Sequence, residues 1–214
     1  GCDTSKLVYY PENAEATPQG KVKYRAVLKN SGNVGAKDIT IINVFPFIGD
    51  TRGSEYFAHL AAPVSFNDPS TTVYYTTVSN PCMPEFNPDI NPAGCNTPSW
   101  TTIPPADITS VKAIKMTRSA SIAPLDSLVY TWPMITPVGV PSNITMYNSY
   151  TYQLSRADNS AQLLPATPNK VGMITSCISA LGSLGNYVWV DSNANGLQDE
   201  SILAGLNGLK IYLY

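Results

Sequence analysis

Residues 21–46, KVKYRAVLKNSGNVGAKDITIINVFP, decide the fold class of this chain. Over residues 21–29 apolar and basic side chains alternate, and this period of two predicts a β-strand that is buried on one face. The apolar positions are expected to face the core and the basic positions to face water. The expected core face carries Val22, Tyr24, Ala26 and Leu28, and the expected solvent face carries Lys21, Lys23, Arg25 and Lys29.

The rest of this stretch predicts a second strand after a turn. Residues 30–35, NSGNVG, are rich in the residue types that turns favour. Residues 39–44, ITIINV, are β-prone and apolar on both faces, so we expect a more deeply buried strand that stops at Pro46. Two strands joined by so short a turn predict a hairpin.

Strand signals recur along most of the chain, and each is bounded by Pro, Gly, Asn or Asp. No helical periodicity separates these runs, so we expect an all-β protein with a β-sandwich over residues 1–180. One of the connections, residues 49–53, is expected to be stabilised by side-chain hydrogen bonds of Asp50 and Arg52. The further strand candidates are residues 7–10, 56–60, 72–78, 111–116, 127–132, 144–154 and 170–174.

The composition excludes several classes of partner. Charged residues are 13% of the chain, about half the usual share, and the formal net charge is −2. The densest basic group is the spaced trio Lys21, Lys23 and Arg25, so nucleic acid and anionic membranes are poor candidates for partners. No apolar run approaches the length that spans a bilayer, so we expect no direct membrane insertion.

The chain has 4 cysteines and no CxxC pair, which favours two disulfides in an oxidising compartment over a zinc site. Cys82 and Cys95 bracket a loop rich in Pro and Asn that lacks the apolar residues to hold itself together, so we expect them to pair. The second expected pair, Cys2 with Cys177, would join the two ends of the sandwich. The alternative is that Cys2 is a lipidated cysteine, which would leave Cys177 as a free thiol.

The sequence near the end of the chain, DSNANGLQDE over residues 191–200, has the spacing of a calcium loop. Ile202 occupies the position where such a loop usually carries a glutamate, so the expected Ca²⁺ site is weak. The alternative is a turn that caps a hairpin through Asx hydrogen bonds. The expected ligands are the side chains of Asp191, Asn193, Asn195 and Asp199 and the carbonyl of Leu197.

Residues around this loop resemble the opening of the B-type repeat of serine-aspartate-repeat (Sdr) surface adhesins, G-x-Y-V-W-x-D-x-N-x-x-G-x-Q-D. Gly185, Tyr187, Trp189, Gln198 and Asp199 are among the matching positions. The resemblance implies that residues 184–214 are the start of a second, calcium-binding β-sandwich module. Strands are expected at residues 186–190 and 209–214 on either side of the loop.

The first part of the chain resembles a second family. Tyr24, Asn30, Gly32, Ala36 and Pro46 lie at the spacing of a bacterial surface repeat whose members are immunoglobulin-like sandwiches. This resemblance extends over most of residues 1–180. It implies an extracellular or cell-surface location and no catalytic residues.

Candidate catalytic residues are few. His59 is the only histidine and no G-x-S-x-G motif accompanies it, so we expect a structural role for His59 and no enzymatic activity. Trp100, Tyr147, Tyr150 and Tyr152 could line a carbohydrate platform, although packing explains such aromatic residues more simply.

Together these patterns predict a non-catalytic structural or adhesive module of an extracellular bacterial surface protein, stiffened by calcium. Its expected partners are other surface modules, copies of itself, or a host or matrix protein or glycan. One alternative is a subunit of an extracellular filament that assembles by strand addition. Another is a carbohydrate-binding accessory domain of a secreted enzyme.

Overall fold

The computed structural model describes residues 6–176 and Ser192. These residues form eleven β-strands and one short 3-10 helix, η1 (Ile108–Ser110), and include no α-helix. The prediction of an all-β sandwich is therefore confirmed. The chain divides between Ile178 and Ser179 into two units. The expected second module, residues 184–214, lies outside the described residues apart from Ser192.

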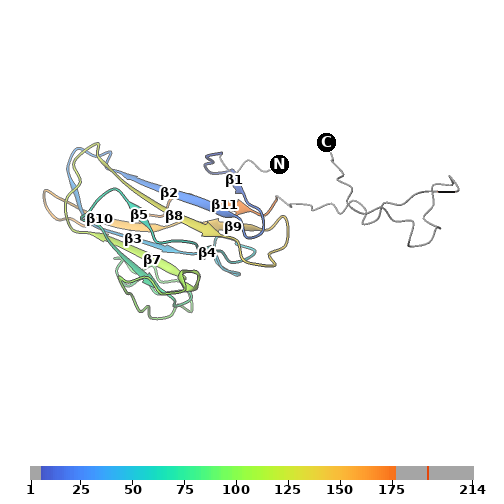
Figure 1. The fold of residues 1–214 in the computed structure, drawn as a ribbon. Helices are drawn as coiled ribbons and strands as arrows, with labels where there is room; N and C mark the ends of the chain where they lie inside the picture. Colours follow the sequence, from blue (N-terminus) through green and yellow to red (C-terminus); the bar gives the residue numbers. More distant parts are fainter. Residues whose placement is uncertain (1–5, 177–191, 193–214) are drawn as a thin grey trace. The chain divides into compact units, whose positions relative to one another are not determined.

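The strands form three sheets (Figure 1). One sheet contains β2 (Lys21–Lys29), β8 (Ser127–Ile135) and β4 (His59–Leu60) in that order, with β5 (Ser65–Phe66) also pairing with β8. A second has the order β10 (Thr151–Arg156), β3 (Ala36–Val44), β7 (Ala113–Arg118) and β6 (Thr72–Thr76). The third has the order β1 (Asn13–Glu15), β11 (Val171–Ile174) and β9 (Thr145–Asn148).

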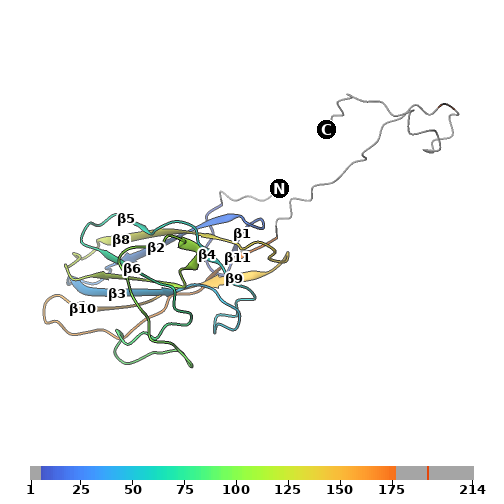
Figure 2. The same ribbon diagram turned by 60° about the horizontal axis from the view of Figure 1, so that its bottom comes forward.

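The core lies between the two larger sheets. Figure 2 shows β2 and β8 in one layer and β3 and β10 in the other. Ile39 and Ile41 of β3 and Tyr130 and Met134 of β8 belong to one buried cluster, and each is at most 1% exposed. The third sheet adds Met146 and Met173 to the same cluster, so all three sheets share one core.

The alternating pattern of residues 21–29 gives the strand that it predicts. The bounds of β2 match the expected ones, Ala26 and Leu28 are buried, and all four basic side chains are exposed. The neighbouring strand β8 continues past its expected end at residue 132 to Ile135. It tolerates Pro133 because Pro133 lies opposite Lys23, at a position where no N–H is needed for the ladder with β2.

The expected hairpin of residues 21–44 is wrong. β2 pairs with β8, whereas β3 pairs with β7 and β10 in the opposite sheet. The turn between them crosses from one layer to the other, and the Asn30 side chain fixes it by donating to the carbonyls of Val34 and Ile122 (2.9 and 3.2 Å). An added Cβ at Gly35 would lie 2.5 Å from the Ser121 hydroxyl and 3.1 Å from the Ala157 Cβ, so neighbouring side chains would have to shift to admit one.

Other expected strands are shorter or shifted. Residues 7–10 form no strand, because the chain turns at Tyr10 and Pro11, and the first strand is β1. The run 144–154 is interrupted at residues 149–150 and divides into β9 and β10, which belong to different sheets. The runs 56–60, 72–78, 111–116 and 170–174 each contain a strand, but its ends differ by one to three residues.

The third sheet joins the first and last strands of the described unit. β1 and β11 are parallel, with Asn13 opposite Gly172 and Glu15 opposite Ile174. The Ala16 N–H extends this pairing by donating to the Ile174 carbonyl (2.9 Å). The two ends of the sandwich are thus bonded to each other directly.

The predicted disulfide Cys82–Cys95 is present and closes the Pro-rich loop, which contacts β7 and β10. A disulfide of this kind is typical of proteins that work in an extracellular or otherwise oxidising compartment. The other predicted pair, Cys2 with Cys177, lies outside the described residues.

Candidate functional site

Three sheet edges in this unit are covered. The edge of β9 is capped by Ser54 and Glu55, whose side chains accept from the Tyr147 and Thr145 N–H groups (3.0 and 2.7 Å). Residues 161–166 run along β10 and exchange backbone hydrogen bonds with it. Thr101 likewise exchanges two backbone hydrogen bonds with Tyr75 of β6.

β2 is the longest strand with an uncovered edge, because no strand pairs with its second edge anywhere in residues 6–176. The Asn30 N–H donates to Asp126 and the Gly20 carbonyl accepts from Thr136, so even-numbered positions make the ladder with β8. The N–H and C=O groups of the odd-numbered positions therefore point to the other edge. This edge extends over nine residues, and no strand of the described residues occupies it.

The outward side chains of the same odd positions are four cations and Val27. Their neighbours across the ladder on β8 are uncharged, for example Pro133 beside Lys23 and Thr131 beside Arg25. Six other Lys or Arg side chains of the described residues form ion pairs with carboxylates, but none of these four does. The β2 edge thus combines unused backbone groups with a row of unpaired positive charge.

Three hollows follow β2 from end to end. One of about 690 Å³ lies between residues 6–9 and residues 22–27 of β2, and the outward side chains of Lys23 and Arg25 help to line it. A second, about 70 Å³, lies at Tyr24 to Ala26 and is bounded on its far side by residues 148–150 and 168–171. A third, about 380 Å³, lies between Leu28 and the side chains of Leu154 and Leu163. We call this row of hollows the β2 cleft.

The middle of the β2 cleft is polar. Tyr24 and Trp132 stack with ring centroids 5.9 Å apart, and Asn43 and Asn148 line the same hollow. The Tyr24 hydroxyl, the Trp132 N–H and both carboxamides are buried without a protein hydrogen-bond partner among the described residues. Burial raises the pKa of Tyr24, so the phenol is neutral at pH 7 and can both donate and accept. The centre therefore suits a neutral polar group.

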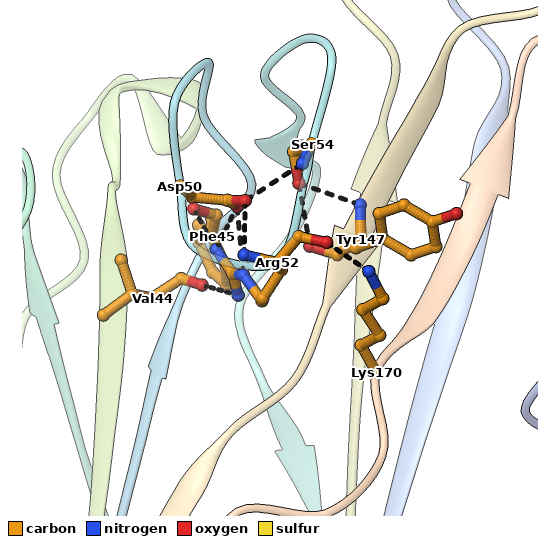
Figure 3. A network of polar contacts seen from close by, with 7 residues as sticks. All are labelled: Val44, Phe45, Asp50, Arg52, Ser54, Tyr147 and Lys170. Atoms are coloured by element: carbon orange, nitrogen blue, oxygen red, sulfur yellow. Dashed lines mark hydrogen bonds and ion pairs between the residues drawn. The ribbon is translucent and has the colours of Figure 1, made fainter.

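The far wall of the cleft is held by a network around Arg52 (Figure 3). The Arg52 guanidinium donates to the carbonyls of Val44 and Phe45 (2.6 and 3.1 Å) and to the Asp50 carboxylate (2.7 Å). The Lys170 ammonium donates to the Arg52 carbonyl and lies 3.9 Å from the centre of the Tyr147 ring. Because Lys170 is flanked by two residues that line the cleft, this network fixes the wall in place.

Asp50 is the acceptor at the centre of that network. Its carboxylate also accepts from the Ser54 N–H (3.0 Å). Burial alone would raise the pKa of Asp50, but the hydrogen bonds from Ser54 and the charge of Arg52 together hold it below the ordinary value. The expectation that Asp50 and Arg52 stabilise this loop is confirmed.

The other predicted site residues lie apart from the cleft or outside the described residues. The five expected calcium ligands, Asp191 to Asp199, are outside them. Within the described part of the chain, no three His, Cys, Asp or Glu side chains lie close enough to hold a metal ion. The same residues contain no helix long and apolar enough to cross a membrane.

His59 and the aromatic residues do not form a common site. His59 lies on β4 beside the Phe57 ring, and burial and then the charge of Lys112 lower its pKa. Lys115 lies over the Trp100 ring and Lys170 over the Tyr147 ring. Tyr150 and Tyr152 pack against the core. The four aromatic side chains therefore do not share one exposed face.

The β2 cleft was not predicted, because the expected hairpin would have covered one edge of β2. The basic face was visible in the sequence, and alternating charge on a strand is itself typical of a sheet edge. Asn43 in an otherwise apolar strand was the only sequence signal for the polar centre.

Comparison with known proteins adds little to this picture. No family model and no curated protein matches the chain. Among solved structures, the chain is similar to AvmM, which catalyses macrocyclization in alchivemycin A biosynthesis, with a TM-score of 0.30 and 8% identity over 78% of this chain and 86% of that one. It is also similar to a family 123 glycoside hydrolase from Clostridium perfringens, with a TM-score of 0.26 and 9% identity over 76% and 22% of the two chains. Likeness this low carries no argument about function.

Proposed function

We propose that this protein is a non-catalytic, load-bearing module of an extracellular surface protein, the function that its family resemblances imply. One observation carries the proposal: the first and last strands, β1 and β11, are adjacent and parallel. The Cys82–Cys95 disulfide agrees with an extracellular location.

The parallel pairing determines how the fold responds to tension. A force applied through the chain ends pulls β1 from its Asn13 end and β11 from its Ile174 end, in opposite directions along the strands. The hydrogen bonds between the two strands are then loaded together, in shear, and no bond can open alone. Antiparallel terminal strands pulled from adjacent ends would instead open one bond at a time. A spacer between a cell surface and a bound target needs the first behaviour.

Single-molecule force spectroscopy on the protein, held at its two ends, tests this proposal. Ala16→Pro removes the hydrogen bond from Ala16 to Ile174 and should lower the unfolding force strongly. Leu128→Ala in β8 is the control, because it destabilises the core by about 2–5 kcal/mol without touching the β1–β11 pair.

The expected result is that Leu128→Ala lowers stability in urea but leaves the unfolding force closer to that of the wild type. The unfolding force depends on the unfolding rate along the pulled direction, whereas urea unfolding measures the overall free energy of unfolding. The two variants should therefore rank differently in the two measurements. Equal losses of force in the two variants would show that β1 and β11 do not bear the load.

A further inference from the structure

The β2 cleft has the features of a binding site for an extended peptide. A strand added at the free edge would bond to the odd-numbered backbone groups of β2, as in other cases of recognition by strand addition. Its side chains would then alternate between the cleft and the outer face of the sheet. The chemistry of each side determines which peptide fits.

On the outer face, side chains of the added strand would lie in rows beside Lys21, Lys23, Arg25 and Lys29. Opposite charges at such cross-strand positions attract, and like charges repel. The four cations form no ion pair with a carboxylate within the described part of the chain. Acidic side chains on the added strand would therefore supply the carboxylates that these cations lack.

On the inner side, the cleft is apolar at its end near Leu28, polar in the middle and mixed at the other end. Leu28, Leu154 and Leu163 line one end, and the other end has Val8 and Val22 next to Lys23 and Arg25. Between them lie the unpartnered groups of Tyr24, Trp132, Asn43 and Asn148. An inward-facing valine would leave those polar groups buried and unpaired, whereas a neutral polar side chain would bond to them.

We propose that the β2 edge binds an extended segment of another polypeptide in which acidic side chains on the outer face alternate with apolar ones that enter the cleft, with one neutral polar residue near the centre. A second copy of this chain is a poor occupant through its own β2, because two such edges would bring eight cations together. The 214 residues contain no two acidic residues at positions two apart, so the segment lies outside them. This inference is independent of the load-bearing function and stands or fails separately.

Binding of three labelled nine-residue peptides to the full chain, followed by fluorescence anisotropy, tests the proposal. In the first peptide glutamate alternates with valine, in the second lysine replaces each glutamate, and in the third asparagine replaces one of the two middle valines of the first. We expect the asparagine peptide to bind most tightly and the lysine peptide at least about tenfold more weakly than the glutamate peptide. Raising the salt concentration should weaken binding of both glutamate peptides.

Two controls connect binding to β2. The double variant with Lys23→Glu and Arg25→Glu should abolish the preference between the glutamate and lysine peptides, since it leaves two cations and two anions on the outward face of β2; both replaced side chains are exposed. The matched control, with Lys37→Glu and Lys112→Glu, changes the net charge equally but away from the β2 edge and should leave the preference unchanged. N-methylation of the peptide at alternate residues should abolish binding, because it removes the N–H groups that pair with β2.

Several results would overturn the proposal. These are no binding of either glutamate peptide at about 1 mM, equal binding of the glutamate and lysine peptides, and unchanged binding after N-methylation. Equal affinity of the asparagine and valine peptides would overturn the role of the polar centre. Peptide binding only after removal of residues 177–214 would identify the chain's own end as the occupant and would also overturn the proposal.

Discussion

At the scale of single residues, Asp50 is the main hydrogen-bond acceptor that stabilises the loop after β3. It accepts from Arg52 and Ser54 at once, and its side chain is only 4% exposed. Replacement by Asn keeps the shape but removes the charge that Arg52 is bonded to. The guanidinium would then be buried with no anion beside it, which is the costly way to break an ion pair.

We predict that Asp50→Asn lowers the free energy of unfolding at pH 7 by about 3 kcal/mol, the lower end for a buried pair. The folded protein lowers the pKa of this carboxyl below its unfolded value of about 3.9, so the stabilisation is present above that pH. It is lost as the pH falls through the folded pKa. Urea unfolding at pH 7 and in steps below pH 4 should therefore show a difference between the variant and the wild type that shrinks with acidification.

Asp158→Asn is the matched control, because Asp158 forms an exposed ion pair with Arg156 (2.6 Å). This substitution should leave the free energy of unfolding nearly unchanged at pH 7 and at each step below pH 4. A constant difference between Asp50→Asn and the wild type across the acidic range would contradict the assigned role of the carboxylate.

At the scale of elements, the loop closed by Cys82–Cys95 shows how a poorly packed segment is kept in place. Its residue Phe86 is buried, and the Asn87 N–H donates to the Gln153 side chain on β10 (3.0 Å). These two contacts anchor the middle of the loop, and the disulfide joins its ends.

We predict that the double substitution Cys82→Ser and Cys95→Ser lowers the free energy of unfolding by about 3 kcal/mol, the amount expected for a loop of this length. Limited proteolysis should then cut the chain between residues 82 and 95 well before the sandwich unfolds. The wild type in a reducing agent should behave like the variant. An unchanged unfolding midpoint would mean that the contacts of Phe86 and Asn87 suffice.

The elements also show what the sequence can and cannot predict here. Strict alternation predicted β2 to the residue, because one face meets the core and the other meets water. It could not predict the partner, because the same alternation suits pairing with β3 or with β8. The apolar run around Tyr147 to Tyr152 looked continuous, yet it changes sheets at Ser149, whose hydroxyl donates to Pro168, a contact distant in sequence.

The site was less predictable than the fold for the same reason. The four cations of β2 were visible as a basic face, but their importance depends on an edge that only the topology reveals. The cluster of Tyr24, Asn43, Trp132 and Asn148 brings together residues from four parts of the chain. No local pattern relates them.

At the scale of the whole molecule, the second unit is expected to respond to calcium. Asp191, Asn193, Asn195 and Asp199, with the Leu197 carbonyl, should bind one Ca²⁺ with a Kd of roughly 0.1–1 mM, the range of extracellular modules. At calcium a few times Kd the stabilisation would be about 1 kcal/mol. Calorimetric titration of the protein measures this, with Asp191→Ala as the control; no heat of binding at millimolar calcium, or equal binding by the variant, would exclude the site.

The parallel pair of β1 and β11 also constrains the order in which the molecule is completed. Asn13 lies opposite Gly172, so the pair closes a loop that spans almost the entire described unit. Contacts this distant in sequence form late, because the entropy of closing the loop must be overcome before the contact contributes. During synthesis from the N-terminus, β1 has no partner in this sheet until Val171 to Ile174 have been made. A chain interrupted earlier can fold much of the two larger sheets but leaves β1 unpaired, so the small third sheet distinguishes finished copies from unfinished ones.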